Sequence, residues 1–257
     1  MARSTETWSL LRRARLAGVG LKEESITDFH LLAFNEASIE GFSVRAISRQ
    51  EERASGADFE WWFGDRGGRW LGMRVQAKRV DHQENFRALN YHPSGATVPQ
   101  SLALLDTCTK LNLLPVYCIY VYSEAFLEPL HGCSLLSPLI VSRFPRNVKV
   151  TLEQVSRCLV PWTLLVCTER GRWHPTRSSR SLTDIALEGW VDAMGYGHGN
   201  LPRELDTGDD WRSFGRAPFT ANPPRYVAEL LAEQPLENEG ELQERNLRGV
   251  VVIRETE

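Results

Sequence analysis

A run of eight residues near the middle of the chain constrains the fold more than any other feature. Residues 115–122 read Pro-Val-Tyr-Cys-Ile-Tyr-Val-Tyr, a β-branched and aromatic composition that is typical of strands. Successive side chains of a strand point to opposite faces of its sheet, so this run predicts a strand with apolar cover on both faces. We therefore expect a central sheet that lies between two layers of helices.

The elements around this strand predict an α/β core. Residues 23–37 contain no Pro or Gly, space Ile26 and Phe29 as an amphipathic helix does, and begin with two acidic residues. The segment Gly64–Gly68 separates two strand-like runs and indicates a hairpin. From the N-terminus, the sequence predicts a helix, three strands, a helix and a strand at residues 23–37, 42–47, 56–63, 70–80, 99–113 and 115–122.

The second half of the chain has weaker patterns. We expect residues 1–125 to form the core domain and residues 126–257 to form a C-terminal α+β extension packed on it. Within the extension, the apolar patterns predict two strands, a helix, a long loop, a second helix and an edge strand, at residues 134–142, 161–168, 182–194, 195–224, 226–234 and 250–253.

The composition excludes several classes of protein. A formal net charge of -3 over 257 residues argues against a protein that coats nucleic acid, because such domains carry a basic excess. The chain has no run of about 18 apolar residues and no signal-peptide core at its start, so we expect a cytoplasmic protein without a membrane segment. The 5 cysteines form no CxxC pair, which favours buried free thiols over a structural zinc site or a disulfide framework.

Four polar residues on the expected hairpin indicate a catalytic site. Asp58 and Glu60 point to one face of the first strand, and Gln76 and Lys78 share a face of the returning strand, so we expect the hairpin to place the first pair opposite the second. Burying such groups among aromatic residues is costly unless they have a function. Carboxylate and amide oxygens suit Mg²⁺ or Mn²⁺, and a fixed ammonium can orient an attacking water or offset charge on a phosphate. The pattern therefore predicts metal-dependent phosphodiester chemistry.

These residues also resemble a known superfamily. The string Gly-Ala-Asp58, a hairpin, and then Val-Gln76-Ala-Lys78-Arg is similar to the PD-(D/E)xK superfamily of restriction-endonuclease-like nucleases, in the QxK variant found in Mrr-like enzymes. The resemblance covers residues 23–122 and implies an αβββαβ core with a mixed central sheet flanked by helices. It departs from the usual pattern at Ala57, where a proline often precedes the motif aspartate. The same stretch also looks like a bacterial family whose role is uncharacterised.

The resemblance assigns roles to individual residues. It implies that Asp58, Gln76 and Lys78 are catalytic, and that a glutamate of the first helix joins them. The helical phase favours Glu23 for this position, whereas the resemblance leans to Glu24, so both stay candidates. The implied metal ligands are Asp58, Gln76 and Glu24.

Further residues extend the predicted site. Glu60 is a candidate supporting group from the strand pattern, and Gln100 is one by the resemblance, since some relatives carry a glutamine in the helix after the lysine strand. A patch with four arginines at residues 170–180 is the best local basic surface. The candidate nucleic-acid-binding residues are Arg79, Arg172, Arg177 and Arg180.

The resulting expectation is an endonuclease that uses Mg²⁺ or Mn²⁺ and hydrolyses DNA. By analogy with the superfamily, it would act in bacterial defence against foreign or viral DNA, as a homodimer or with partner proteins of a defence system. An alternative of another class is a catalytically inactive nuclease-fold module that binds nucleic acid or a partner protein. The two differ in whether binding to DNA survives removal of divalent metal.

Overall fold

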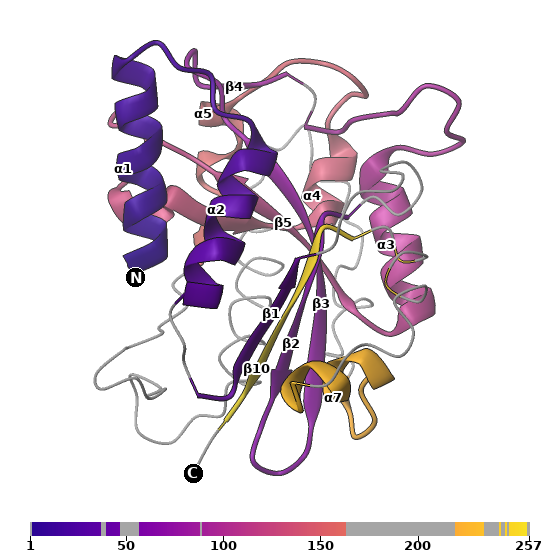
Figure 1. Cartoon of the computed structure of the whole chain (residues 1–257). Helices are drawn as coiled ribbons and strands as arrows, with labels where there is room; N and C mark the ends of the chain where they lie inside the picture. Colours follow the sequence, from indigo (N-terminus) through magenta and orange to yellow (C-terminus); the bar gives the residue numbers. More distant parts are fainter. Residues whose placement is uncertain are drawn as a thin grey trace.

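The computed structural model describes residues 2–36, 40–46, 57–87, 89–162, 219–233, 242, 245 and 247–255. Over these residues the protein is a mixed α/β structure built on an eight-stranded sheet (Figure 1). The strands of this sheet are β1 (Phe42–Ala46), β2 (Phe59–Gly64), β3 (Trp70–Arg79), β5 (Leu114–Tyr120), β6 (Cys133–Leu136), β8 (Val160–Pro161), β9 (Phe219–Thr220) and β10 (Gly249–Arg254).

The helices and a small second sheet complete the described structure. The helices are α1 (Ala2–Leu16), α2 (Glu23–Glu36), α3 (Gln100–Leu111), α4 (Pro138–Arg143), α5 (Leu152–Ser156) and α7 (Arg225–Leu231), with a 3-10 turn η1 (Pro129–Gly132). Strands β4 (Asn85–Phe86) and β7 (Val150–Thr151) pair with each other. No helix in the described ranges is long and apolar enough to cross a membrane.

The sheet confirms the central part of the predicted core. Its order is β1-β10-β2-β3-β5-β6-β8, and β9 pairs with the start of β3. Strands β2 and β3 form the expected antiparallel hairpin, and β5 runs parallel to β3 with Val75 opposite Val116. Strand β5 lies between β3 and β6 and is almost wholly buried, as the run of residues 115–122 predicted.

The last strand is placed differently from the prediction. Residues 250–253 were expected at an edge, but β10 lies between β1 and β2, antiparallel to the first and parallel to the second. All four residues are fully buried. Four consecutive apolar residues can be covered on both faces, and this applies to β10 as it does to β5. The sheet therefore takes strands from both sides of residue 125.

Two further differences concern helices, and one expected helix is confirmed. The sequence did not predict α1, which buries only Trp8 and Leu11 among its large apolar residues and has no continuous apolar stripe. The strand expected at residues 134–142 ends at Leu136, because Ser137 caps α4 by accepting a hydrogen bond from the Leu139 amide. The expected helix at residues 226–234 is confirmed as α7, whereas residues 182–194 lie outside the described part of the chain.

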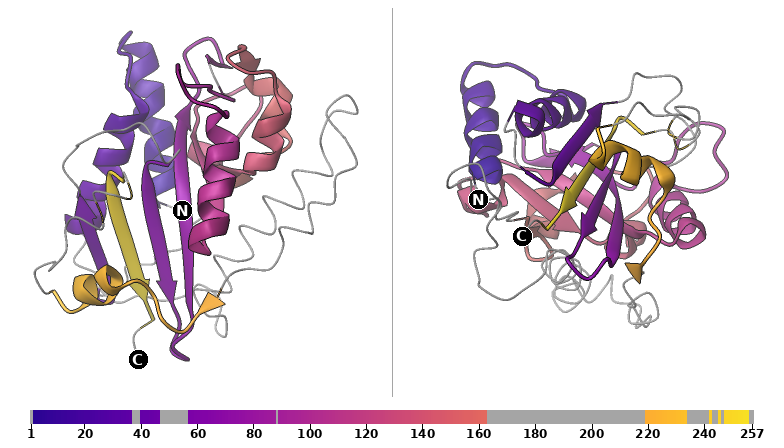
Figure 2. Two further views of the ribbon diagram at one scale, coloured as in Figure 1. Left: turned by 90° about the vertical axis from the view of Figure 1, so that its right-hand side faces the viewer. Right: turned by 60° about the horizontal axis from the view of Figure 1, so that its bottom comes forward.

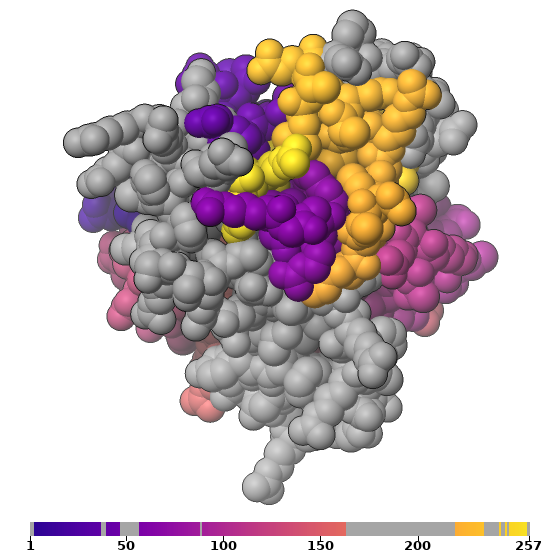
Figure 3. Space-filling model, turned by 90° about the horizontal axis from the view of Figure 1, so that it is seen from below, coloured from indigo at the N-terminus to yellow at the C-terminus, as the bar shows by residue number. Residues whose placement is uncertain are grey.

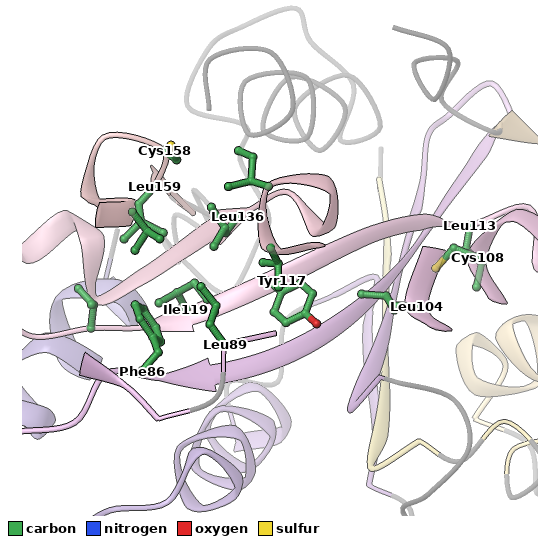
Figure 4. Packing of buried hydrophobic residues seen from close by; sticks show 14 of the residues in the cluster. Phe86, Leu89, Leu104, Cys108, Leu113, Tyr117, Ile119, Leu136, Cys158 and Leu159 are labelled. Carbon is green, nitrogen blue, oxygen red and sulfur yellow. The ribbon is translucent and has the colours of Figure 1, made fainter. Parts of the chain in front are cut away.

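Helices cover both faces of the sheet. Figure 2 shows α1 and α2 on one side of the strands and α3 and α4 on the other. One face packs side chains of β5, β6 and α3 into a common core, in which Tyr117, Ile119, Leu136 and Leu104 are fully buried (Figure 4). The opposite face packs Trp61, Val116 and other strand residues against Ile26 and Phe34 of α2. Helices on both faces of the sheet thus cover β5, as the apolar run at residues 115–122 predicted.

A buried network of charged and aromatic groups joins Tyr226 of α7 and Arg245 to the sheet. The Glu60 carboxylate is fully buried and accepts hydrogen bonds from Tyr226 Oη at 2.5 Å, Trp62 Nε1 at 3.2 Å and Arg245 Nη1 at 3.3 Å. The guanidinium of Arg74, 1% exposed, lies 3.9 Å from the same carboxylate. Figure 3 shows residues 219–233 lying against the turn between β2 and β3. Glu60 thus holds α7 against the sheet through Tyr226.

Removing this carboxylate should destabilise the protein strongly. We expect Glu60→Ala to lower the free energy of unfolding by about 3 to 5 kcal/mol, because Arg74 would stay buried without its partner. The matched control is Asp106→Ala, which breaks an exposed pair with Lys110 (Nζ–Oδ2 2.7 Å) and should cost less than about 1 kcal/mol. Urea unfolding of both variants measures the difference. Equal losses would contradict a structural role for Glu60.

Candidate active site

Polar residues from five elements meet at one end of the sheet. Asp58 directly precedes β2, and Gln76 and Lys78 lie near the end of the antiparallel β3, so the three share this end. Arg248 directly precedes β10, which is parallel to β2. Glu23 and Glu24 begin α2, and Gln100 begins α3. Because helix N-termini favour negative charge, the starts of both helices add to the attraction of this end for anions.

Asp58 is the most constrained of these groups. Its Oδ2 accepts hydrogen bonds of 2.6 Å from the Ala77 amide and from Gln76 Nε2. Burial raises the pKa of Asp58 to about 6; the hydrogen bond from Ala77 and the charges of Lys78 and Arg248 oppose this rise, and Glu23 adds to it. The carboxylate is thus held in a place where its negative charge is only partly compensated.

The two glutamines form a chain of amides next to Asp58. Gln76 Oε1 accepts a hydrogen bond of 2.8 Å from Gln100 Nε2, and Gln76 Nε2 donates to Asp58. Gln100 Oε1 is buried and has no hydrogen-bond partner. Turning both amides over would give Gln100 Oε1 a donor and place Gln76 Oε1 beside Asp58. Gln76 Nε2 would then no longer donate to the Ala77 carbonyl, 3.0 Å away, and a cation or a proton on Asp58 would be needed between the facing oxygens.

Lys78 keeps its ammonium available. Burial lowers the pKa of Lys78, and the nearby carboxylates of Asp58, Glu23 and Glu24 oppose this effect. Its Nζ lies 5.7 Å from the centroid of the Tyr91 ring. Within the described ranges, no carboxylate lies within ion-pair distance of Nζ and no hydrogen bond uses it. The ammonium can therefore serve a bound molecule.

Arg248 belongs to the site although sequence reasoning missed it. Its Nε lies 3.5 Å from Asp58 Oδ1 and its Nη2 lies 3.5 Å from Glu24 Oε1, and the residue is only 9% exposed. Its amide also donates a hydrogen bond of 2.6 Å to the Asp58 carbonyl. No local signal marks this arginine, because its proximity to Asp58 depends on the insertion of β10 next to β2. Its contact also places Glu24 at the site, while Glu23 acts on both Asp58 and Lys78 through its charge.

Two other predicted residues have different surroundings. Glu60 faces Arg74 in the hairpin, two positions short of Gln76, and its carboxylate belongs to the buried network with Tyr226. The expectation that Glu60 lies opposite the QxK pair is therefore wrong by the register of the strands. Arg79 donates a hydrogen bond to the Val80 carbonyl and lines an open cavity of about 590 Å³. The remaining candidates Arg172, Arg177 and Arg180 lie outside the described residues.

The donor set of the site is carboxylate and amide oxygen. In the described part of the chain, no group of three or more His, Cys, Asp and Glu side chains is placed to hold a metal ion. A cation at this end of the sheet would therefore need an amide oxygen, such as that of Gln76, beside the carboxylates. Hard divalent cations accept such mixed oxygen sets.

One family model matches the protein over residues 1–257, and its description is "Family of unknown function (DUF6615)". The chain belongs to this family. The DUF6615 match includes both Asp58 and Arg248, so the family model spans the two distant segments that meet at the site. No curated protein matches the chain. No solved structure matches it either.

The raised pKa of Asp58 predicts a pH-dependent stability in the absence of metal. Folding raises this pKa from 3.8 to about 6, so the folded protein holds the proton more tightly and loses stability as pH rises through this interval. Asp58→Asn does not titrate. We expect the unfolding free energy of the variant, relative to the wild type, to grow by about 2.5 kcal/mol between pH 4 and pH 7.5.

This measurement uses denaturant unfolding in buffer with EDTA. Asp106→Asn, on the exposed face of α3, is the matched control for the same chemical change. An unfolding free-energy difference for Asp58→Asn that does not change with pH would contradict the partly compensated carboxylate.

Proposed function

We propose that this protein is a divalent-metal-dependent nuclease that hydrolyses phosphodiester bonds of DNA. The observation that carries the proposal is the meeting of Asp58, Gln76, Lys78 and Glu24 at one end of the sheet. The order α2, β1, β2, β3, α3, β5 supports a restriction-endonuclease-like core, because it is the order that the resemblance implies. The inserted β10 would then be an addition to that core.

The residues present fit a divalent cation. Asp58, Glu24 and Gln76 would hold it, with Glu23 as a neighbouring carboxylate. The buried and unpartnered Gln100 Oε1 supports this assignment, because reversing both amides satisfies that oxygen and presents Gln76 Oε1 on the side of Asp58. The chemistry that Mg²⁺ or Mn²⁺ supplies in such a site is Lewis-acid polarisation of the phosphate.

The protein's own groups would perform the remaining tasks. The Lys78 ammonium would orient the attacking water or offset charge on the phosphate, since no carboxylate in the described ranges pairs with it directly. Gln100 would set the orientation of the Gln76 amide. Arg248 compensates the two carboxylates in this structure, and its planar guanidinium would pair with a substrate phosphate when a cation takes the carboxylates.

An open cavity with several arginines supports a nucleic-acid substrate. The cavity has a volume of about 590 Å³ and is lined by Arg15, Arg79 and Arg87, with Asp81, which lies 3.9 Å from Arg87. Arg79 follows Lys78 in β3, so the two side chains leave the strand on opposite faces. Arginine binds phosphate well, and an overall charge of -3 is compatible with one local basic surface.

Plasmid cleavage tests the proposed activity. We expect wild type to nick or cut DNA with Mg²⁺ or Mn²⁺, and Asp58→Ala and Lys78→Ala to lose about a hundredfold or more of the rate. Asp106→Ala and Lys110→Ala make the same chemical changes on the exposed face of α3 and should keep full activity. Equal cleavage by wild type and both site variants, or cleavage that persists in EDTA, would sink the idea.

Arg248 gives a second test that does not depend on cleavage. We expect Arg248→Met to bind Mn²⁺ about tenfold more tightly than the wild type, because the cation would no longer compete with a guanidinium for Asp58 and Glu24. Titration calorimetry with Mn²⁺ alone measures this. Arg254→Met, an exposed arginine on the same strand, is the matched control and should leave binding unchanged. Weaker Mn²⁺ binding by Arg248→Met would contradict competition between the guanidinium and the cation.

One observation favours a second candidate function. Because Arg248 already pairs with both Asp58 and Glu24, the same residues could serve a catalytically inactive module that binds nucleic acid or a partner protein. Such a module would retain DNA in EDTA and in the Lys78→Ala variant without cutting it. A role in bacterial defence, in a homodimer or with partner proteins, rests on the resemblance alone.

A further inference from the structure

A small cavity lies between α1, α2 and the sheet, with a lining distinct from the candidate active site. It has a volume of about 50 Å³. Its apolar lining includes Phe34, Phe59, Trp61 and Trp162, and Cys118 and Cys133 contribute two thiols. Arg3, His30 and Thr27 supply polar groups to the same lining. An apolar cavity with a few convergent polar groups is the usual form of a small-molecule site.

Three nitrogen atoms of this lining are buried without hydrogen-bond partners. They are Arg3 Nη1, His30 Nδ1 and Trp61 Nε1. His30 is 7% exposed and Trp61 is 4% exposed, so neither ring can reach bulk water freely. Buried polar groups are normally paired, and leaving one unpaired is costly. Three such atoms around one cavity point to a small bound molecule that offers hydrogen-bonding oxygen.

The thiol of Cys133 is part of an ordered array. The Thr7 hydroxyl donates to the Arg3 carbonyl at 2.9 Å, so its oxygen is left to accept from His30 Nε2 at 2.9 Å and from Cys133 Sγ at 3.3 Å. Sγ lies 3.6 Å from His30 Nε2. The His30 ring is held between Phe34 and Tyr120, with centroids 6.1 and 5.6 Å away. A thiol, a base and a group that orients the base form the usual arrangement for an activated nucleophile.

The electrostatic surroundings favour the thiolate of Cys133. A hydrogen bond with Cys118 lowers the pKa of Cys133 most, the charge and hydrogen bond of His30 and the hydroxyl of Thr7 lower it further, and burial opposes them. Cys108 differs, because burial raises its pKa and no such array surrounds it in the described structure. The thiolate is the reactive form of cysteine, so Cys133 should react before Cys108.

Cys118 is placed to be the second thiol. In the antiparallel pair β5 and β6, Cys118 lies opposite Leu135 and Cys133 lies opposite Tyr120. The two cysteines are therefore diagonal neighbours on one face, where side chains are close enough to interact. Both line the cavity.

We propose that this cavity is a peroxide-reactive site, in which hydrogen peroxide oxidises Cys133 and Cys118 is the resolving thiol. A water-sized molecule needs about 10 to 15 Å³, so the cavity admits a molecule as small as hydrogen peroxide. The apolar lining disfavours charged oxidants. The unpartnered N–H groups of Trp61 and Arg3 supply hydrogen bonds to the peroxide oxygens.

The reaction is balanced with these groups alone. The Cys133 thiol gives its proton to the His30 imidazole, and the resulting thiolate attacks one peroxide oxygen, so that an S–O bond forms and the O–O bond breaks. The departing hydroxide takes a proton from the His30 imidazolium and leaves as water, and Cys133 becomes a sulfenic acid. The Cys118 thiol then displaces the hydroxyl from Cys133, forming an S–S bond and a second water. The two thiols supply the two electrons that reduce the peroxide.

Peptide mass spectrometry of the full chain treated with equimolar hydrogen peroxide tests the site. Trypsin releases Cys118 and Cys133 together in residues 111–143 and Cys108 in residues 88–110, so Cys108 is an internal reference. We expect the 111–143 peptide to lose two hydrogen atoms at least ten times faster than Cys108 is oxidised. In Cys118→Ser, dimedone should instead label Cys133 as a sulfenic acid.

The variant His30→Gln tests whether the imidazole activates the Cys133 thiol. It keeps a polar side chain in the array but removes the imidazole, and we expect it to slow oxidation of Cys133 at least tenfold without changing Cys108. Oxidation of Cys133 no faster than Cys108 in the wild type would overturn the proposal, and this comparison stands even if the variant fails to fold. An unchanged rate in folded His30→Gln would overturn it too. Neither result depends on nuclease activity.

Discussion

The pairing of β10 with β1 and β2 is the interaction on which the rest of the described structure depends. Strands β1 and β2 do not pair with each other, and both of their facing edges are hydrogen-bonded to β10. Val250, Val251, Val252 and Ile253 are fully buried there. A sheet that opened at this position would expose two unpaired edges and the apolar side chains on both faces. The last described segment of the chain therefore closes its central sheet.

The same pairing brings two charged groups to the sheet. Arg248 reaches Asp58 because it directly precedes β10, and Arg245 reaches Glu60 from just before it. Asp58 and Glu60 are two residues apart on one strand, yet their surroundings differ. Glu60 receives three hydrogen bonds from side chains and lies near Arg74, whereas Asp58 is held with a raised pKa among partly compensated charges. Satisfied buried groups stabilise a fold, and incompletely satisfied ones are typical of functional sites.

Helix α2 connects the candidate active site with the small cavity. Its first turn carries Glu23 and Glu24, and His30 lies nearly two turns further along. Contacts of Thr27 with Tyr120 and of His30 with Thr7 hold the helix to β5 and to α1. Because one rigid helix supplies groups to both places, its position against the sheet sets the geometry of both.

The sequence alone determined the elements whose patterns are local. The apolar run at residues 115–122 predicted the buried central strand, and the glycines at 64–68 predicted the hairpin. The hairpin also explains why Asp58 and Gln76 could be placed together in advance, since strands joined by a short turn have few registers. The residue opposite Glu60 still differed from the expectation. It is Arg74, because the pairing depends on the length of the turn between the two strands.

Only the tertiary structure decided which distant segments meet. Nothing near residues 250–253 indicates that they pair with β1 and β2, so neither the central position of β10 nor the contact of Arg248 with Asp58 was predictable. The same is true of Cys133, His30 and Thr7, which come from three elements separated by up to 126 residues. Alternation and helical spacing report which face of an element is buried. They carry no information on the element that covers it, because that choice is made by packing across the whole chain.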